Sequence, residues 1–370
     1  MIHDRLVRAD FPAWKDPATP GCYHLDVMRE FRLQQELSRY RVGGFALPLG
    51  IIPGDMIEPV QGYTVTYNAG EHEEPDTYTF HAVVSHERIM RLVNDAFELL
   101  PDSVIPIIEI GSRDAYRSLD VYVSQIELPI QEFMESWHRY KAVLLEDASI
   151  GIGANSNEPY LEVFLDCWKG VAIHAPLEMR QSIETLLAEH GLEEVQSTWQ
   201  DNAEGDDVTH SGVREVLEIV DDESADLDEL LHRLREELAL DLNIDPESNC
   251  DETGRELGMT LWQAVIVAEP TAGDPSEGAY LTFWMTASSL RQVEELIDQA
   301  MQVQDVWVCE SLYSVDRMAF DERPDDLADL PLVRSEAQIH FVEVDPWASR
   351  ATPEQEGARD PFDEDDDGTA

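Results

Sequence analysis

The order of strand-like and helix-like segments constrains the fold of this chain more than any other feature. In residues 149–176, SIGIGANSNEPYLEVFLDCWKGVAIHAP, the segments YLEVFL and GVAIHA are rich in β-branched and aromatic residues, which predicts two strands joined by a break at 167–170. Only then does PLEMRQSIETLLAEHGL predict a helix, with Pro176 suited to its first turn and Gly191 to its C-terminal end. Two strands before one helix argue against a doubly wound parallel sheet and favour antiparallel pairing.

The same stretch contains Gly151 and Gly153 in a G-x-G pattern. A phosphate-binding glycine loop leads into a helix N-terminus, where free N–H groups and the helix dipole meet the anion. Here the chain continues through Asn155 and Pro159 into a strand instead. We therefore expect the glycines at a strand-to-strand connection, and we expect no bound cofactor.

Strands and helices follow each other in similar order along most of the chain, so we predict an α+β fold with two sandwich-type domains. Each domain should have helices on one face of a mainly antiparallel sheet. The predicted segments are a helical arm at 1–41, an α+β domain at 42–199, an acidic connector at 200–256, a second α+β domain at 257–345 and a disordered acidic tail at 346–370. The connector should contain one amphipathic helix, because leucines recur at helical spacing from Leu227 to Leu238 behind a capping box at Asp226 and Glu229.

Two segments in the halves of the chain resemble each other weakly. YTFHAVVSHERIMRLVNDAF and YLTFWMTASSLRQVEELIDQAM share a Thr-Phe pair, followed at matching distances by Ser85 or Ser288 and by Arg88 or Arg291. A diverged internal duplication is one interpretation, and a chance match between two strand–helix segments is the other.

The charge balance is extreme, with 77 acidic and 25 basic residues and a formal charge of −52. Residues 201–256 carry −16 and residues 354–370 carry −7, which leaves −29 on the rest of the chain, so the folded surfaces must be acidic too. Such surfaces suit concentrated salt, where charge repulsion is screened within a few ångströms. Salt adaptation is our preferred interpretation, and a cationic partner is the alternative. The scarcity of cations argues against direct nucleic acid binding, because binding phosphates requires clustered basic residues.

Cysteine usage and hydropathy indicate the compartment. The four cysteines, Cys22, Cys167, Cys250 and Cys309, are far apart and form no C-x-x-C pair, which argues against a zinc ribbon or a disulfide framework. The N-terminus has no apolar segment of signal-peptide length, and no run of 18 apolar residues occurs. We expect a cytoplasmic protein with no membrane association.

The N-terminal arm differs from the rest of the chain, because its first 41 residues hold seven bases against six acids. LDVMREFRLQQELSRYR predicts a helix that buries Phe31 and Leu37 and turns arginines outward, among them Arg29 and Arg32. The arm should lie against an acidic face of this chain or of a partner, with Arg29 and Arg32 as interaction candidates. Apolar burial must hold the arm, because exposed ion pairs contribute only about 0–1 kcal/mol each.

Three histidines are weak catalytic candidates. His81, His86 and Glu87 form an H-x4-H-E pattern, one residue too long for two histidines on one helix face, so we expect no metal site. His174 ends a predicted strand and could approach His81 across a sheet. Carboxylate pairs such as Glu162 with Asp166 suit acid–base chemistry only in an apolar pocket, and 77 acids make such pairs common.

Trp168 and Lys169 lie at a predicted hairpin tip. Exposed there, they would form an interface anchor, and folded back over the sheet they would be structural.

No recognisable catalytic set is present, so our leading hypothesis is a non-enzymatic protein-binding or scaffold protein that binds a protein partner or self-associates. The alternative is a hydrolase-type enzyme without a sequence signature. Histidines that meet buried carboxylates would favour the enzyme, and scattered exposed histidines would favour binding.

Overall fold

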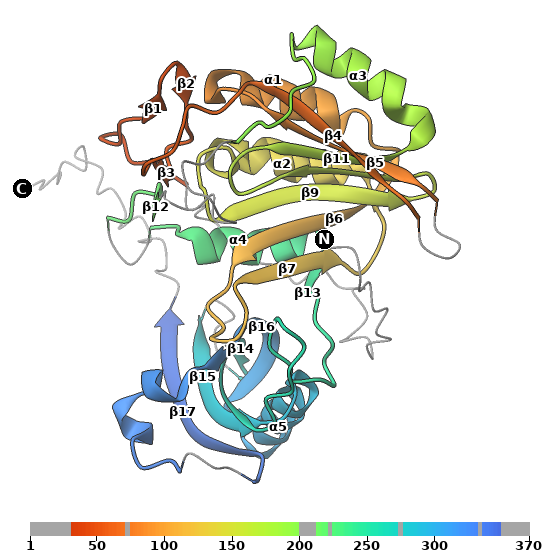
Figure 1. The fold of residues 1–370 in the computed structure, drawn as a ribbon. Coiled ribbons are helices and arrows are strands. Elements are labelled where there is room, and N and C mark those ends of the chain that lie inside the picture. The colour runs from red at the N-terminus through yellow and green to blue at the C-terminus, as the bar shows by residue number, and fades with distance from the viewer. Residues whose placement is uncertain are drawn as a thin grey trace, which may run out of the picture. The chain divides into compact units, whose positions relative to one another are not determined.

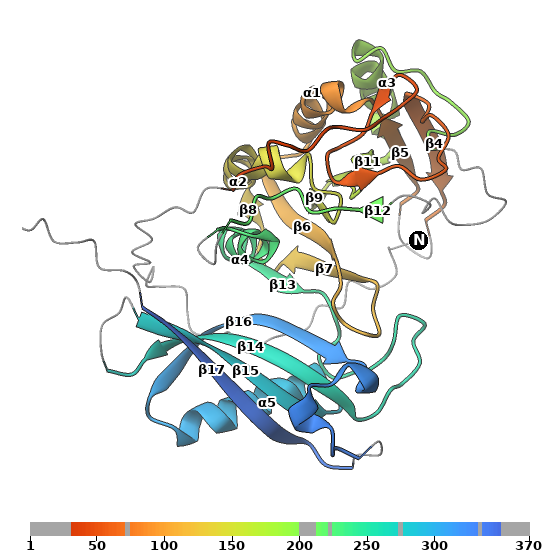
Figure 2. The same cartoon turned by 90° about the vertical axis from the view of Figure 1, so that its left-hand side faces the viewer.

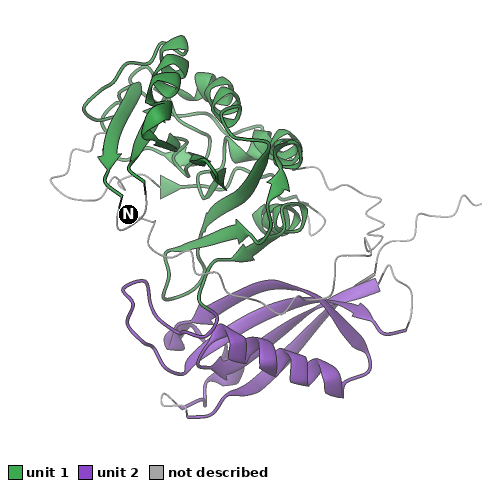
Figure 3. Ribbon diagram, turned by 90° about the vertical axis from the view of Figure 1, so that its right-hand side faces the viewer, with its two compact units in different colours: residues 1–245 green, residues 246–370 purple. Residues whose placement is uncertain are grey.

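The computed structural model describes residues 31–70, 75–199, 212–220, 224–272, 277–331 and 335–348. The chain divides into two compact units, residues 1–245 and residues 246–370, shown in different colours in Figure 3. Both units mix helices with antiparallel sheets, which confirms the predicted α+β class. Within the described ranges, no helix is long and apolar enough to cross a membrane.

The first unit is built on a nine-stranded antiparallel sheet (Figure 1). Its strands are β4 (Gly62–Asn68), β5 (Thr77–Val83), β6 (Ser103–Gly111), β7 (Leu119–Ser124), β8 (Leu128–Pro129), β9 (Ile150–Asn157), β10 (Tyr160–Leu165), β11 (Val171–Pro176) and β13 (Leu240–Leu242). The strand order is β13-β7-β6-β9-β10-β11-β5-β4, with β8 paired to β6. The meander β9-β10-β11 therefore lies in the middle, as short connections between consecutive strands favour.

Four helices of the first unit pack on one face of this sheet. They are α1 (His86–Phe97), α2 (Ile130–Leu144), α3 (Arg180–Glu189, preceded by the 3₁₀ turn η1 at Leu177–Met179) and α4 (Leu227–Glu237). Leu92, Trp137 and Leu230 from three of them share one hydrophobic core with strand residues such as Phe80 and Ile152. Figure 2 shows α1, α2 and α4 on the same side of the strands. Because strand side chains alternate between faces, the intervening residues form a second face, and none of the described helices packs on it.

Helix α4 lies in the segment that we predicted as an acidic connector. The Asp226 side chain accepts a hydrogen bond from the Glu229 backbone N–H, as the capping box requires. The helix buries Leu230 and Leu234 in the core, and β13 follows it to pair with β7. This part of the predicted connector is therefore an integral part of the first unit.

The predicted N-terminal helix is wrong for its described part, and residues 25–30 lie outside the described residues. Residues 31–40 are not helical, and Leu33 instead forms an antiparallel bridge with Leu217. The backbone N–H of Gln34 donates to the Val216 carbonyl at 2.9 Å. Phe31 and Leu33 both pack against the core from this extended segment, so pairing with residues 212–220 overrode the helical periodicity.

Two small sheets complete the first unit. One joins β1 (Arg41–Val42) to β2 (Phe45–Ala46), and the other joins β3 (Ile51–Ile52) to β12 (Gly212–Val213). Both pairs are antiparallel, and they fix the path of residues 41–52.

The second unit has a four-stranded antiparallel sheet of order β16-β14-β15-β17 and one long helix. Its elements are β14 (Thr260–Pro270), β15 (Glu277–Ala287), α5 (Leu290–Val303), β16 (Trp307–Met318), the 3₁₀ turns η2 (Phe320–Glu322) and η3 (Asp325–Leu327), and β17 (Gln338–Ala348). The Ser289 side chain caps α5, which buries Val293 and Ile297.

The two units share the order hairpin, helix, strand, but their strands pair differently. In the second unit β16 returns to pair with β14, whereas β6 in the first unit pairs with β7, β8 and β9. The helix caps also differ by one position from the sequence match, because Ser289 and not Ser288 caps α5. This difference in pairing weighs against a simple duplication.

Gly151 and Gly153 lie inside strand β9 and not in a connection, which corrects our placement of them. A Cβ atom on Gly153 would lie 2.3 Å from the Val163 carbonyl oxygen and 2.5 Å from the Phe164 ring. The glycines therefore let the Phe164 ring lie against the β9 backbone.

We expect Gly153→Ala to lower the free energy of unfolding by about 1–3 kcal/mol, because the added methyl group overpacks a backbone contact. Urea denaturation of the variant measures this effect. Gly111→Ala is the matched control, since no atom lies within 4 Å of a Cβ at that strand position. Equal stability of the two variants would contradict the close packing of Phe164 on β9.

Candidate functional site

The helix-free face of the first unit carries a row of polar side chains across its central strands. Strand register places Thr79 on β5 opposite His174 on β11, His174 opposite Glu162 on β10, and Glu162 opposite Asn155 on β9. Directly paired residues on neighbouring strands have close Cβ atoms, so this row brings the four side chains together. We call the face that carries them the open face.

His81 and Asp166 form a second polar pair on the open face. The His81 Nε2 atom lies 3.0 Å from Asp166 Oδ2, and His81 Nδ1 lies 3.5 Å from the Thr198 hydroxyl. Gly170 permits the first contact, because a Cβ there would lie 2.3 Å from His81 Nε2 and 2.7 Å from the Asp166 carboxylate. A carboxylate that holds one ring nitrogen fixes the orientation of an imidazole.

His174 lies on the strand next to His81, so the structure places both histidines on one face, as the sequence suggested. Its Nδ1 atom lies 2.7 Å from the Thr79 hydroxyl, and its Nε2 atom lies 3.6 Å from Glu162 Oε1. Each histidine therefore has its own carboxylate partner.

Two glutamates of the open face titrate near neutrality. Burial raises the pKa of Glu162 to about 7, although a hydrogen bond from the Asn155 amide lowers it. Burial also raises the pKa of Glu109 on β6 to about 7, and the nearby charges of Glu162 and Asp166 add to this effect. Carboxyl groups with a pKa near the working pH are suited to general acid–base chemistry.

Two acceptors on the open face receive no hydrogen bond from the residues that the structure describes. Asn155 is only 6% exposed, and its Oδ1 atom has no hydrogen-bond partner in the part of the chain that the structure describes. No side chain or backbone group among the described residues donates a hydrogen bond to Glu109. A buried acceptor without a donor is rare, which makes Asn155 unusual, whereas the half-buried Glu109 carboxyl group remains accessible to solvent.

A hydrophobic cluster covers one end of the open face. Val83 packs there with Phe45, Leu47 and Ile51, and Trp168 and Trp199 cover its edge. The rings of Trp168 and Trp199 meet edge to face with centroids 6.0 Å apart. The polar groups begin next to this cluster, at His81.

Trp168 and Lys169 fold back onto the sheet and do not project as an exposed pair. Lys169 is 3% exposed and donates from Nζ to the Ile150 carbonyl at 2.7 Å, so an interface role for it is wrong. Burial lowers the pKa of its ammonium group, and the charges of Cys167, Asp147 and Asp166 partly offset this. Trp168 is half-buried against Trp199, which leaves only part of its ring accessible.

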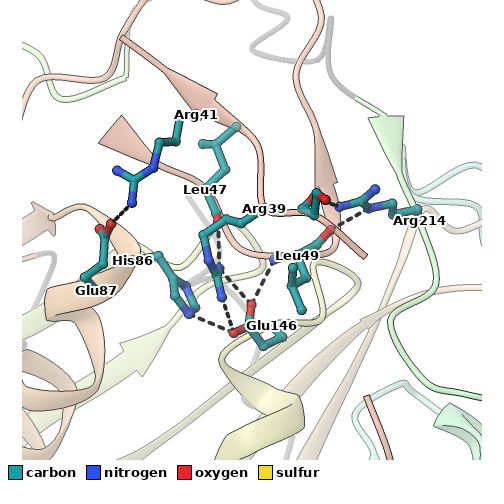
Figure 4. A network of polar contacts seen from close by, with 9 residues as sticks. Arg39, Arg41, Leu47, Leu49, His86, Glu87, Glu146 and Arg214 are labelled. Carbon is teal, nitrogen blue, oxygen red and sulfur yellow. Dashed lines mark hydrogen bonds and ion pairs between the residues drawn. The ribbon is translucent and has the colours of Figure 1, made fainter. Parts of the chain in front are cut away.

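His86 lies in a separate network, shown in Figure 4. Its Nε2 atom lies 3.0 Å from Glu146 Oε1, and both Glu146 oxygens also accept hydrogen bonds from Arg39, at 2.6 and 2.9 Å. Arg39 donates to the Leu47 carbonyl as well, and the Leu49 N–H donates to Glu146 at 2.9 Å. These contacts attach residues 39–49 to the end of α2.

The donors around Glu146 set its charge state. Burial alone would raise its pKa, but hydrogen bonds from His86 and Arg39 lower the pKa to about 2. Glu146 is therefore ionised at neutral pH, where it holds this network together. His86 and His81 meet different carboxylates, so the H-x4-H-E pattern does not form one site.

Of the two arginine candidates, Arg29 lies outside the described residues. Arg32 is exposed, and its backbone carbonyl accepts a hydrogen bond from the Glu218 N–H at 2.7 Å. The backbone of Arg32 thus attaches residues 31–34 to the segment 212–220.

Sequence reasoning did not single out Glu109 and Asn155. Each interrupts an apolar or small-residue run, in VIPIIEI and IGIGANS, and a polar residue inside such a strand was the available signal. Among the described side chains, no group of three or more His, Cys, Asp and Glu residues is arranged to hold a metal ion.

A scan against protein-family models finds no match for this chain, and searches of curated proteins and of solved structures find no similar protein.

Proposed function

We propose that the open face binds a small polar molecule and carries out acid–base chemistry on it, of the hydrolase type. The observation that supports this most directly is Glu109, a half-buried carboxyl group with a pKa raised to about 7 and no described hydrogen-bond donor. Glu162 has a similarly raised pKa on the same face. The histidines His81 and His174 each meet a carboxylate there, the arrangement expected of an enzyme more than of a scaffold.

These glutamates reduce the stability of the folded chain. A carboxyl group whose pKa is higher in the folded state loses stability as the pH rises from its unfolded pKa of about 4.5 to its folded pKa of about 7. At about 1.4 kcal/mol per pKa unit, each glutamate costs up to about 3 kcal/mol above pH 7. Ionisable groups that lower the stability of the folded state in this way are typical of functional sites.

The proposed chemistry follows from the charge state of Glu109 and Glu162, each of which is about half protonated near pH 7. The ionised carboxylate would take a proton from an attacking water molecule, while the protonated one would donate a proton to the leaving group. The His81–Asp166 pair, 3.0 Å apart, would orient a donor toward the same ligand.

The substitution Glu109→Gln tests this role with two readouts. We expect it to raise the free energy of unfolding at pH 8 by about 1–3 kcal/mol, because it removes a partly desolvated charge, and to leave stability at pH 5 nearly unchanged. We also expect it to abolish hydrolysis of p-nitrophenyl ester and glycoside substrates by the full-length chain. Glu98→Gln, an exposed glutamate after α1, is the control and should change neither. Unchanged stability at pH 8 together with unchanged hydrolysis would contradict the proposal.

A second candidate is the protein-binding or scaffold function that the sequence favoured. In the second unit, Val303 at the end of α5 is 87% exposed, and Val306 and Val308 just before and within β16 are also exposed. Neighbouring exposed apolar side chains are typical of protein contact sites. In this interpretation the protein is cytoplasmic and salt-tolerant, its thiols stay reduced, and its acidic segments, including the predicted tail, keep it dispersed.

Affinity capture from native lysate at high salt tests the scaffold candidate. A partner retained by the unchanged chain and lost from a Val303→Ser, Val306→Ser variant would support it. Equal capture by both chains would contradict a contact through these valines.

A further inference from the structure

Strand β17 forms an open edge of the sheet in the second unit. It is 11 residues long and pairs with β15 on one side only (Figure 1). No other described segment makes a backbone hydrogen bond to it. Residues 342–346 are exposed, so no described helix or loop covers this stretch. A row of unpaired backbone N–H and C=O groups of this length can pair with a further strand.

The two faces of this edge differ in chemistry. Val342 and Val344 are 37% and 47% exposed, and they pair with Phe283 and Leu281, which are almost fully buried. Directly paired residues share a face of the sheet, so the two valines extend its buried apolar surface to the edge. Glu343, between them, lies on the other face, because strand side chains alternate.

The acids of this edge have no cationic partner in the part of the chain that the structure describes. Glu343 and Asp345 lie on the same face, opposite Thr282 and Tyr280 of β15. The arginines described in this unit are either buried or bound to other groups, as for Arg255, Arg291, Arg317 and Arg323. Residues 246–370 contain no lysine, the residue that most often protects an edge strand from added strands.

A second copy of this chain fits the edge poorly. Neighbouring strands lie about 4.8 Å apart, so two paired β17 strands would gather Glu343 and Asp345 of both copies on one face. Like charges across a strand pair are destabilising, and no described cation lies there to offset them. The edge therefore favours a strand of opposite charge.

We propose that β17 binds an extended segment of a partner protein in which apolar residues alternate with lysine or arginine. The segment adds a fifth strand to the sheet. Its apolar side chains cover Val342 and Val344, and its cations meet Glu343 and Asp345 on the other face. The alternation distinguishes this partner from a chain that is merely basic. The proposal concerns an edge of the second unit and is independent of the acid–base function proposed for the first.

Fluorescence anisotropy of labelled peptides with the full chain tests the proposal. Valine and lysine alternate over eight residues in two peptides, and N-methylation of every valine in one and of every lysine in the other leaves a single edge free and prevents self-pairing. We expect saturable binding of at least one peptide in about 0.15 M KCl. Binding should weaken but persist in about 1 M KCl, where charges are screened within about 3 Å but backbone pairing and valine burial remain.

Two control peptides separate strand pairing from charge attraction. One is methylated at every residue, so that it has no edge for pairing. The other has the same composition but carries its lysines in one block and its valines in the next. Both should bind at least about tenfold more weakly than the alternating peptide. Hydrogen exchange of the full chain should slow in residues 339–345 when the alternating peptide is bound, and should stay unchanged in β16.

Two variants of the chain locate the site. Val344→Lys should lower the affinity by about tenfold or more, because it removes an apolar contact and places a charge against the apolar side of the added strand. Val308→Lys is the matched control, since Val308 is also 47% exposed and lies on β16, at the opposite edge of the same sheet. Glu343→Lys should weaken binding of the valine–lysine peptide and strengthen binding of a valine–glutamate peptide.

Five results would overturn the proposal. Absence of saturable binding, equal binding of the block peptide, or an equal loss for Val308→Lys would show that the edge of β17 is not a specific site. A dimer of the unchanged chain in sedimentation analysis that Val344→Lys abolishes would identify a second copy as the occupant. Tighter peptide binding after deletion of residues 1–30 would mean that this segment of the same chain occupies the edge.

Discussion

Replacing Glu146 with glutamine should lower the free energy of unfolding by about 3 kcal/mol at pH 7. The folded-state pKa of Glu146 is about 2 against an ordinary 4.5, and this difference converts to roughly that energy at about 1.4 kcal/mol per unit. Glutamine keeps the shape but leaves Arg39 and His86 facing an amide in a mostly buried network, the situation in which breaking an ion pair is costly. Urea denaturation at pH 7 measures the effect.

The pH dependence of this loss identifies its cause. A carboxyl group with a depressed folded pKa contributes stability above its unfolded pKa of about 4.5, and that stability disappears as the pH falls toward about 2. The gap between the unchanged chain and Glu146→Gln should therefore close over this range. Glu132→Gln, in the exposed first turn of the same helix, is the control and should cost less than about 0.5 kcal/mol. A gap that persists at pH 2 would show that packing, not charge, is what Glu146 contributes.

Sequence patterns within one segment correctly predicted several helices and strands. Helices α1, α2 and α5 follow from apolar residues at helical spacing, and the capping box predicted the start of α4 at Leu227. The strand pair β10 and β11 and the helix after it also follow from composition, because β-branched and aromatic residues alternate there. These signals lie within one element and depend little on the rest of the chain.

Long-range pairing decided the parts that sequence reasoning placed wrongly. Residues 31–40 have apolar spacing that suits a helix, but Leu33 pairs with Leu217, more than 180 positions away, and the helix does not form. Gly151 and Gly153 look like turn residues in the sequence, but in the structure they lie in β9 and leave room for the Phe164 ring of the neighbouring strand. A short stretch of sequence around Leu33 does not include Leu217, and one around the glycines does not show that Phe164 packs against them.

The candidate site was predictable only in part for the same reason. The sequence allowed His174, at the end of one predicted strand, to approach His81 on another predicted strand across a sheet. Their carboxylate partners Asp166 and Glu162 depend on strand register, which a single sequence does not specify. Glu109 enters from β6, two strands away from β10, and its only local signal is that it interrupts the apolar run VIPIIEI.

Deleting residues 1–41 should lower the melting temperature at both low and high salt. The deletion removes Phe31, whose ring packs edge to face on Tyr140 at 5.7 Å and lies under the Arg233 guanidinium at 5.1 Å. It also removes Leu33 and Arg39, the residue that neutralises Glu146. Loss of two half-buried apolar side chains and of this ion pair amounts to roughly 5 kcal/mol, which is a large part of the stability of an ordinary domain.

Two comparisons separate the contributions to this effect. Deletion of residues 1–30 retains Phe31, Leu33 and Arg39, so it should leave most of the stability in place. In about 1 M salt the exposed charges are screened within about 3 Å, whereas apolar burial and the mostly buried Arg39–Glu146 pair persist. If the longer deletion lowers the melting temperature only at low salt, charge alone attaches residues 31–41. If both deletions melt at the same temperature, Phe31, Leu33 and Arg39 do not stabilise the fold. The longer deletion should therefore melt well below the shorter one at every salt concentration, because the extended segment is held by burial and by its pairing with residues 212–220.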